Sequence, residues 1–170
     1  MNSKIYLIAH NIRSCHNVGS LLRTADAMAV DKVYLTGYTP YPRMKDDKRL
    51  PHIADKMGRQ IKKTALGAEK TVAWEYTEDV LGLLAKLAKE DTVIAALEQS
   101  PDAISLPEYT PSDKDTALIV GREVEGIEPE VLKVAKIHLE IPMLGSKESL
   151  NVASAAAIAL YQLRFKLRRQ

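Results

Sequence analysis

Residues 141–161 read IPMLGSKESLNVASAAAIALY, and this stretch says most about which fold the chain adopts. The apolar run 137–141 predicts a strand, and a loop with one proline and one glycine follows it. Ser149 and Asn151 then precede an alanine-rich segment with helical spacing. Open α/β sheets bind their ligands just past the carboxyl ends of strands, so these polar side chains are candidates for a site. The alternative for this stretch alone is an ordinary strand–loop–helix unit.

Short apolar runs alternate with helical patterns along the rest of the chain. This alternation predicts an α/β fold with a mostly parallel sheet and helices on both faces. The stretch 99–115, with three prolines and little periodicity, is expected to be a surface connection. The predicted strands are 5–9, 32–36, 71–76, 92–97, 116–121 and 137–141, and the predicted helices between them are 18–28, 54–63, 80–87 and 129–135.

The last predicted helix runs from residue 152 to about residue 168 and is apolar on nearly all sides. Its small residues would allow close packing against another helix or loop. A helix of this kind is buried on more than one side, and a second subunit could supply one of those surfaces. Its main apolar stripe consists of Val152, Ala156, Leu160, Leu163 and Leu167.

The composition predicts a single globular domain covering residues 1–170. No apolar run approaches the roughly 20 residues that a membrane helix needs, and the run at residues 5–9 is too short for a secretory signal. Cys15 is the only cysteine, which excludes an internal disulfide and fits a cytoplasmic protein.

The net charge is only +2, so any contact with nucleic acid must come from local basic patches. The alternative for each patch, and the more common one for such charge runs, is a solvated surface. The candidate patches are Arg43, Lys45, Lys48 and Arg49; Arg59, Lys62 and Lys63; and Arg164, Lys166, Arg168 and Arg169.

Residues 11–27 read NIRSCHNVGSLLRTADA and follow the first predicted strand. Asn17 can cap the helix that follows, and Gly19 permits close approach of a ligand or of backbone. Arg23 lies off the apolar stripe and could clamp a phosphate with its planar guanidinium group. The alternative for Arg23 is a surface residue that makes a salt bridge along the helix.

Residues 117–127 read ALIVGREVEGI and predict a strand that ends in a glycine-containing turn. Gly121 and Gly126 would expose backbone groups to a ligand, and Glu123 could bind a substrate hydroxyl or hold Arg23 in place. Neither of the common glycine-rich phosphate-binding motifs is present. The four histidines show no metal-ligand spacing, so no metal is expected; His16 is the one nearest the Arg23 segment.

Together these three segments resemble the motifs of the SpoU (TrmH-type) RNA 2′-O-ribose methyltransferases of the SPOUT superfamily. Motif 1 has the pattern NxRxxxNxGxxxRTA (residues 11–25), motif 2 the pattern GxExxG (121–126), and motif 3 the pattern IPMxGxxxSLNV (141–152). The order and spacing of the motifs match over nearly the whole chain. Ala153-Ser154 and Gln162 depart from residues common in relatives.

The resemblance implies a deep trefoil knot at the C-terminus, an S-adenosylmethionine cofactor and an obligate homodimer with sites at the interface. The reaction would be methyl transfer to a ribose 2′-hydroxyl of structured tRNA or rRNA. A 170-residue chain leaves no room for the separate RNA-binding domain of many relatives, so the core would recognise the RNA. Two alternatives stay open: a catalytically inactive knotted RNA-binding protein, and an unrelated α/β enzyme or nucleotide-binding protein.

The resemblance also implies roles for individual residues. Arg23 would contact the phosphate beside the target ribose; since arginine stays protonated, it is expected to stabilise the developing alkoxide rather than act as a general base. The catalytic set would be Arg23, Asn17, Glu123, Ser149 and Asn151. The cofactor pocket would be formed by Leu97, Gly121, Ile141, Met143 and Leu150.

Overall fold

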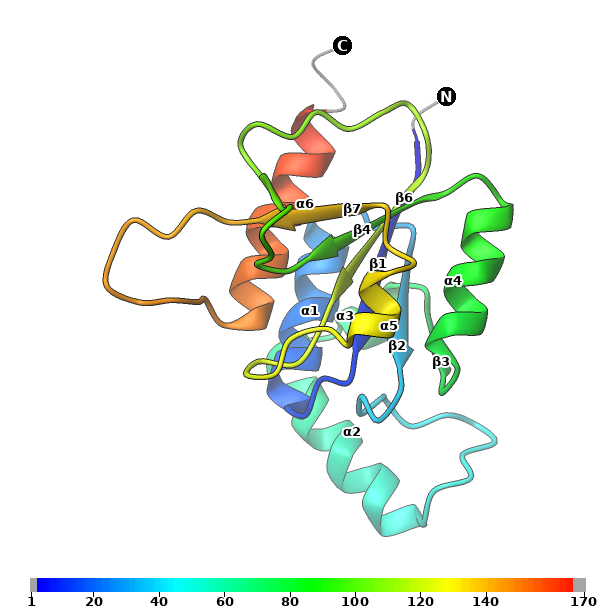
Figure 1. Ribbon diagram of the computed structural model, residues 1–170. Helices are drawn as coiled ribbons and strands as arrows, with labels where there is room; N and C mark the ends of the chain where they lie inside the picture. The colour runs from blue at the N-terminus through cyan, green and yellow to red at the C-terminus, as the bar shows by residue number, and fades with distance from the viewer. Residues whose placement is uncertain (1–2, 167–170) are drawn as a thin grey trace.

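The computed structural model describes residues 3–166 and shows a twisted parallel sheet between two layers of helices (Figure 1). Within these residues the strands run in the order β3-β2-β1-β6-β4-β7-β5, and every pairing is parallel. The strands are β1 (Ile5–His10), β2 (Lys32–Thr36), β3 (Trp74–Thr77), β4 (Val93–Leu97), β5 (Ile104–Ser105), β6 (Thr116–Val120) and β7 (Ile137–Glu140). The helices are α1 (Cys15–Ala27), α2 (Pro51–Ala65), α3 (Ala68–Thr71), α4 (Val80–Lys89), α5 (Pro129–Leu132) and α6 (Val152–Lys166).

The core consists of two layers because side chains alternate between the faces of each strand. On one face, Leu7 and Leu118 pack with residues of α1 and α6, and on the other, Ile8 and Ile119 pack with residues of α4 and α5. The central strand β6 is fully buried, as expected for a parallel sheet covered on both faces. The predicted α/β class, parallel sheet and two helical layers are therefore confirmed.

Helix α2 lies outside this sandwich and packs on α1 (Figure 1). The two helices cross at Gly19, where an added Cβ atom would lie 2.3 Å from the Ile61 carbonyl oxygen. Thr64 Oγ1 donates a hydrogen bond of 2.8 Å to the carbonyl oxygen of His16 at the same crossing. Gly19 thus permits the close approach of the α2 backbone to α1, which is the second of the two predicted alternatives.

Three local predictions were wrong. Asn17 does not cap α1, because Ser14 is the N-cap and its side chain accepts from the amide of Asn17. Thr71 belongs to α3 and not to β3, since a helical turn begins after Gly67. The stretch 99–115 is more than a surface connection: it contributes β5 to the sheet edge and buries Leu106 and Tyr109 in the core.

Helix α6 is held at its end by Arg164, which is buried. Its guanidinium donates hydrogen bonds to the carbonyl oxygens of Met28 (2.9 Å) and Ala29 (2.6 Å), just after α1. Arg164 is therefore a packing residue and not part of a basic surface, contrary to prediction. Leu167, Arg168 and Arg169, which were assigned to this helix or patch, lie outside the described residues. None of the helices in residues 3–166 has the length and apolarity needed to cross a membrane.

Candidate active site at the carboxyl edge of the sheet

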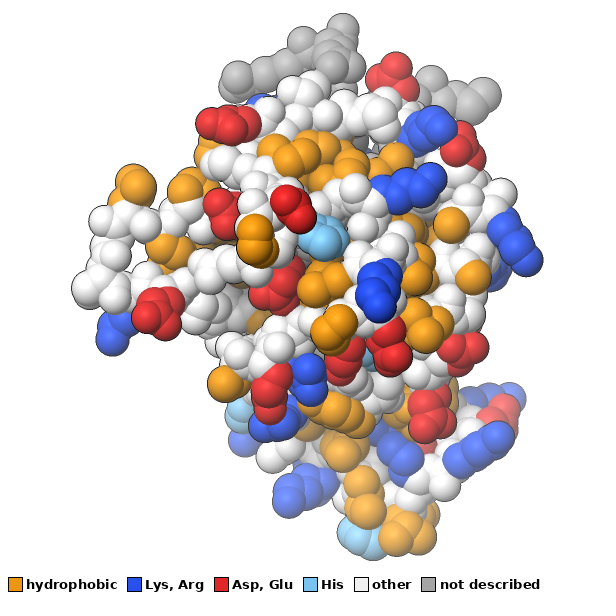
Figure 2. All heavy atoms as spheres, viewed as in Figure 1, with side chains coloured by type: hydrophobic (Ala, Val, Ile, Leu, Met, Phe, Trp, Pro, Cys, Tyr) orange, Lys and Arg blue, Asp and Glu red, His pale blue; other side chains and the backbone are white. Residues whose placement is uncertain are grey.

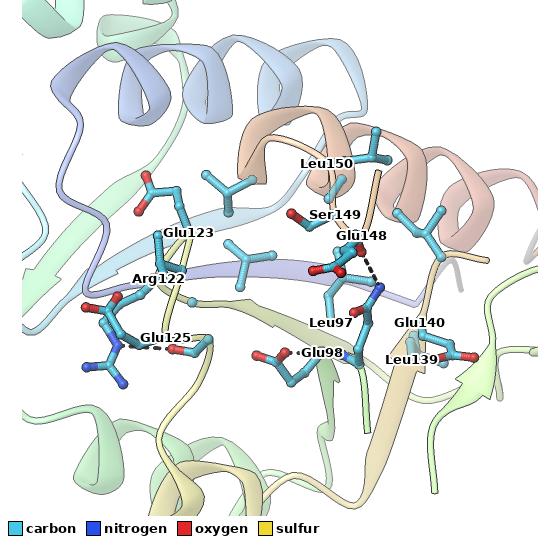
Figure 3. Close-up of a pocket in the computed structure, with 18 of the residues that line it drawn as sticks. Leu97, Glu98, Arg122, Glu123, Glu125, Leu139, Glu140, Glu148, Ser149 and Leu150 are labelled. Carbon is cyan, nitrogen blue, oxygen red and sulfur yellow. Dashed lines mark hydrogen bonds between the residues drawn. The ribbon is translucent and has the colours of Figure 1, made fainter. Parts of the chain in front are cut away.

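A cavity of about 320 Å³ lies past the carboxyl ends of β4, β6 and β7 (Figure 3). Loop 121–126, segment 141–150 and the start of α6 enclose it. The place follows from the parallel topology, because the strands all end at one edge and the loops that leave them form the walls. Five residues predicted for a cofactor pocket line the cavity, namely Leu97, Gly121, Ile141, Met143 and Leu150.

Three predicted catalytic side chains form a hydrogen-bonded network beside this cavity. Asn17 Nδ2 donates to Glu123 Oε1 at 2.8 Å, and Asn151 Nδ2 donates to Asn17 Oδ1 at 3.1 Å. Asn151 Oδ1 accepts from the amide of Ala153 at 3.0 Å, which fixes the orientation of its amide group. The network joins the first turn of α1, the loop after β6 and the segment before α6.

The other two predicted catalytic residues lie differently. Ser149 lines the cavity. Arg23 is an exposed residue of α1 that does not line it, and its side chain forms no hydrogen bond or ion pair with another described residue. Of the two roles expected for Glu123, holding Arg23 in place is not seen within the described residues, where its carboxylate accepts from Asn17 and forms no ion pair with Arg23.

The cavity combines apolar walls with an excess of negative charge. Among the described residues that line it, only Arg122 is cationic. The mixture favours a ligand that has both apolar and cationic parts. The acidic lining residues are Glu98, Glu123, Glu125, Glu140 and Glu148.

Two of these walls are tied together by side chains that the sequence analysis did not select. Glu98 Oε2 accepts from the amide of Ile127 at 2.8 Å, so the end of β4 holds the end of loop 121–126. Gln99 Nε2 donates to the carbonyl oxygen of Glu148 at 2.9 Å, which anchors segment 141–150. Their position directly after β4, at the ligand-binding edge, was the signal that could have identified them.

A buried polar cluster lies at the end of β1, where motif 1 begins. His10 is 5% exposed; its Nδ1 lies 2.8 Å from Thr36 Oγ1, and its Nε2 lies 3.1 Å from Glu128 Oε2. Asn11 donates from Nδ2 to Glu128 Oε1 at 2.8 Å. Burial lowers the pKa of His10, although the carboxylate of Glu128 acts in the opposite direction. The cluster connects the end of β1 with the start of α5.

Exposed charges link motifs 1 and 2 at the rim of the cavity. Arg13 donates to Glu125 Oε1 at 2.9 Å. The pKa of Glu125 is lowered, mainly because the backbone amide of Glu125 donates a hydrogen bond to the Glu125 carboxylate. The positive charges of Arg13 and Arg122 lower this pKa further. Among residues 3–166 there is no group of three or more His, Cys, Asp or Glu that could hold a metal ion.

Comparison with known proteins agrees with the motifs. Residues 4–161 match the model of the SpoU rRNA Methylase family. The chain is 29% identical over 160 residues to the tRNA (guanosine(18)-2′-O)-methyltransferase of Aquifex aeolicus, covering 93% of this chain and 67% of the relative.

Two solved structures share the fold. The A. aeolicus TrmH/SpoU tRNA modifying enzyme superposes with a TM-score of 0.79 at 26% identity, over 98% of this chain and 77% of that chain. The AdoMet-bound rRNA methyltransferase of Sinorhizobium meliloti gives 0.77 at 20% identity, over 99% of this chain and 57% of that chain. The protein thus spans between about half and three quarters of the length of these proteins. Because the family model covers nearly all of it, the chain belongs to the SpoU rRNA methylase family.

Proposed function

We propose that the protein is an S-adenosylmethionine-dependent RNA methyltransferase that acts on a ribose 2′-hydroxyl of structured tRNA or rRNA. The observation that carries the proposal is the Asn17–Glu123–Asn151 network beside an acidic, partly apolar cavity. The named relatives act on tRNA or rRNA, and the S. meliloti neighbour is bound to AdoMet.

The lining of the cavity fits this cofactor. Leu97, Ile141 and Leu150 offer apolar contacts to the adenine and ribose, and the carboxylates nearby complement the ammonium and sulfonium charges. When bound, the cofactor would supply an electrophilic methyl group.

The residues of this chain would align the hydroxyl and stabilise the charge that develops on it. Asn17 and Asn151, which hold each other in place, would orient the ribose, with Ser149 and Glu123 beside them. Arg23 would bind the neighbouring phosphate and stabilise the alkoxide electrostatically. The 2′-hydroxyl would give its proton to solvent water beside the exposed Glu123 as this charge is stabilised.

We further infer a homodimer, because Arg23 lies outside the cavity of its own chain. An interface that brings Arg23 of one subunit to the cavity of the other would complete the site. The outer face of α6 supports this, since Ile158, Tyr161 and Phe165 form an exposed apolar stripe with ring centroids of the last two 4.5 Å apart. The same proposal includes the C-terminal trefoil knot and a cytoplasmic location, where tRNA and rRNA are found.

Calorimetric titration with S-adenosylmethionine and S-adenosylhomocysteine tests the cofactor, with one site per subunit expected. Transfer of a labelled methyl group to total tRNA and to rRNA, followed by mapping of 2′-O-methyl positions, tests the reaction. Folded protein that binds RNA but neither cofactor would be the inactive RNA-binding alternative and would contradict the proposal.

A further inference from the structure

The positive charge of this protein is concentrated in one segment. Between Arg43 and Lys63 there are eight Lys or Arg and three Asp, so these 21 residues carry +5. The rest of the chain has sixteen basic and nineteen acidic residues and carries −3. Figure 2 shows Lys and Arg side chains over the lower part of the molecule, where Figure 1 places α2 and the loop before it.

Helix α2 presents its charges as a stripe. His52, Lys56, Arg59 and Lys63 are all exposed and are spaced by four, three and four residues, so they share one face. The eleven helical steps from His52 to Lys63 span about 16 Å. The buried residues of this helix, which lie on another face, are Ala54, Ile61 and Ala65.

The cations of the stripe are available to a ligand, whereas two nearby arginines are not. Arg49 is 15% exposed, its guanidinium lies 3.6 Å from the centroid of the Tyr41 ring, and its Nε donates to Asp47 Oδ1 at 2.8 Å. Arg43 is paired with Asp55. Arg49 therefore does not belong to a free basic patch, contrary to the prediction from the sequence. In the described part of the chain, Lys56, Arg59, Lys62 and Lys63 form no ion pair.

The loop that supports α2 is fixed in place by Arg49. Its Nη1 donates to the carbonyl oxygen of Tyr41 at 3.0 Å, and Tyr41 stacks on Tyr76 of β3 with ring centroids 4.1 Å apart. The loop is thus anchored to the sheet although it contains no regular structure. A charged surface that is fixed before binding loses less conformational entropy when a ligand is bound.

The stripe also lies close to the candidate active site. Thr64, next to Lys63, donates to the carbonyl oxygen of His16, and His16 precedes Asn17 of the network. Loop 37–50 leaves β2 at the same carboxyl edge as the cavity. The acidic cavity would repel phosphates, and the basic stripe would attract them.

We propose that the outward stripe of α2, made of Lys56, Arg59 and Lys63 with Lys62 beside it, binds the phosphate backbone of the RNA substrate. The backbone lies along α2, which directs the target ribose to the Asn17–Glu123–Asn151 network. This inference rests on the proposed function and identifies the surface that recognises its substrate. The contacts are to phosphates, so they position the RNA without reading its sequence.

The test is the triple charge reversal K56E/R59E/K63E. The control K86E/K89E/K133E makes the same change of charge on exposed lysines of α4 and the end of α5, on the other face of the sheet. Binding of bulk deacylated tRNA is measured between low and moderate salt, together with the KM for the RNA that the wild type methylates. Cofactor affinity and the circular dichroism spectrum report on folding.

The stripe variant should bind tRNA at least 10-fold more weakly at low salt and raise the KM for RNA, with cofactor affinity unchanged. Each lost phosphate contact should reduce the log–log salt slope by roughly 0.7–0.9, so three contacts remove roughly 2.1–2.7. K56Q/R59Q/K63Q should give a smaller effect in the same direction, which separates loss of attraction from added repulsion.

Equal RNA affinity and salt slope in the stripe variant and the wild type would overturn the inference, as would equal losses in the stripe variant and the control. If the stripe instead binds an acidic protein, the stripe variant and the wild type would have equal RNA affinity and an equal salt slope. Failure of the proposed function would give a different result from failure of this inference. The wild type itself would then transfer no methyl group, whereas the salt dependence of its tRNA binding could still be measured.

Discussion

Asn151 donates its side-chain amide to Asn17 across 134 residues of sequence, with 3.1 Å between Nδ2 and Oδ1. Because Asn17 in turn donates to Glu123, the orientation of both amide groups is fixed by their partners. One hydrogen bond thereby joins motif 1 to motif 3, and the next joins motif 1 to motif 2.

Replacing Asn17 by Asp should reduce methyl transfer by about 10²-fold, because the new carboxylate would face Glu123 at the place of a 2.8 Å hydrogen bond and displace the network. Cofactor affinity should stay within about 2-fold. Single-turnover rates and calorimetry measure the two effects. The control is Ser20→Ala on the same helix, which takes no part in the network. Rates for Asn17→Asp that equal those of the control would mean that the network does not position the substrate.

Arg23→Ala should lower methyl transfer by about 10²–10³-fold and leave cofactor binding unchanged, because Arg23 does not line the cofactor cavity of its own chain and its proposed contact at the completed site is with the RNA phosphate. Arg23→Lys should recover little, since an ammonium group cannot reproduce the planar pair of donors. The rate constant at saturating cofactor is the measurement. Near-normal turnover in both variants would place the chemistry on other residues.

Gly19→Ala should destabilise the fold by about 1–3 kcal/mol, because its methyl group would meet the Ile61 carbonyl and neither helix backbone can move freely. Thermal unfolding should show a decrease in Tm of several degrees. Gly145→Ala is the matched control, since no atom lies within 4 Å of its added Cβ. A Tm for Gly19→Ala that equals the control value would contradict the close crossing of α1 and α2.

Asp47 should make the free energy of unfolding depend on pH in the acidic range. Hydrogen bonds from Arg49 are the main cause that lowers the pKa of Asp47 far below its usual value near 3.9. A carboxyl group with a lowered pKa in the folded state adds stability above its unfolded pKa and loses it as pH falls further. Urea unfolding from pH 7 to pH 3 should therefore show a decline below about pH 4. Asp47→Asn should be less stable at pH 7 and should decline less; an unchanged pH slope would contradict this role.

The subunit state can be measured directly. Light scattering should give about twice the 18.9 kDa mass of one chain. Ile158→Glu with Tyr161→Glu should convert the protein to monomers, because both side chains are exposed on one face of α6. Lys86→Glu with Lys89→Glu, on the opposite face of the molecule, should leave the mass unchanged. A wild-type monomer that is active would reject the dimer.

The sheet could be predicted from the sequence because its strands are short apolar runs bounded by turn residues, and a parallel sheet needs no alternating pattern. The cavity residues that belong to motifs 2 and 3 could be predicted because motif spacing and strand ends identify the same edge, whereas Glu98 and Gln99 were missed. The two-residue strand β5 could not, since its pairing with β7 depends on tertiary contacts and has no local signal. Ser14 and Asn17 are both residue types that cap helices, and only the backbone shows that α1 begins after Ser14 and contains Asn17.

The charges of individual side chains were the least predictable feature. Arg49 and Arg164 look like surface cations in sequence, but one stacks on Tyr41 and the other caps carbonyl groups after α1. Both contacts join segments whose mutual position depends on the complete fold. Composition reports how many cations a chain has, and only the structure separates those that hold the protein together from those that remain for a ligand.

The position of β1 between β2 and β6 also bears on how the protein is made. β1 and β2 leave the ribosome well before β6, which begins at Thr116, 106 residues after the end of β1 at His10. Until then one edge of β1, an apolar strand, has no native partner and can pair with other chains. Contacts this far apart in sequence also slow folding. Translation speed and chaperones that act while residues 11–115 are being synthesised should therefore affect the yield of native protein.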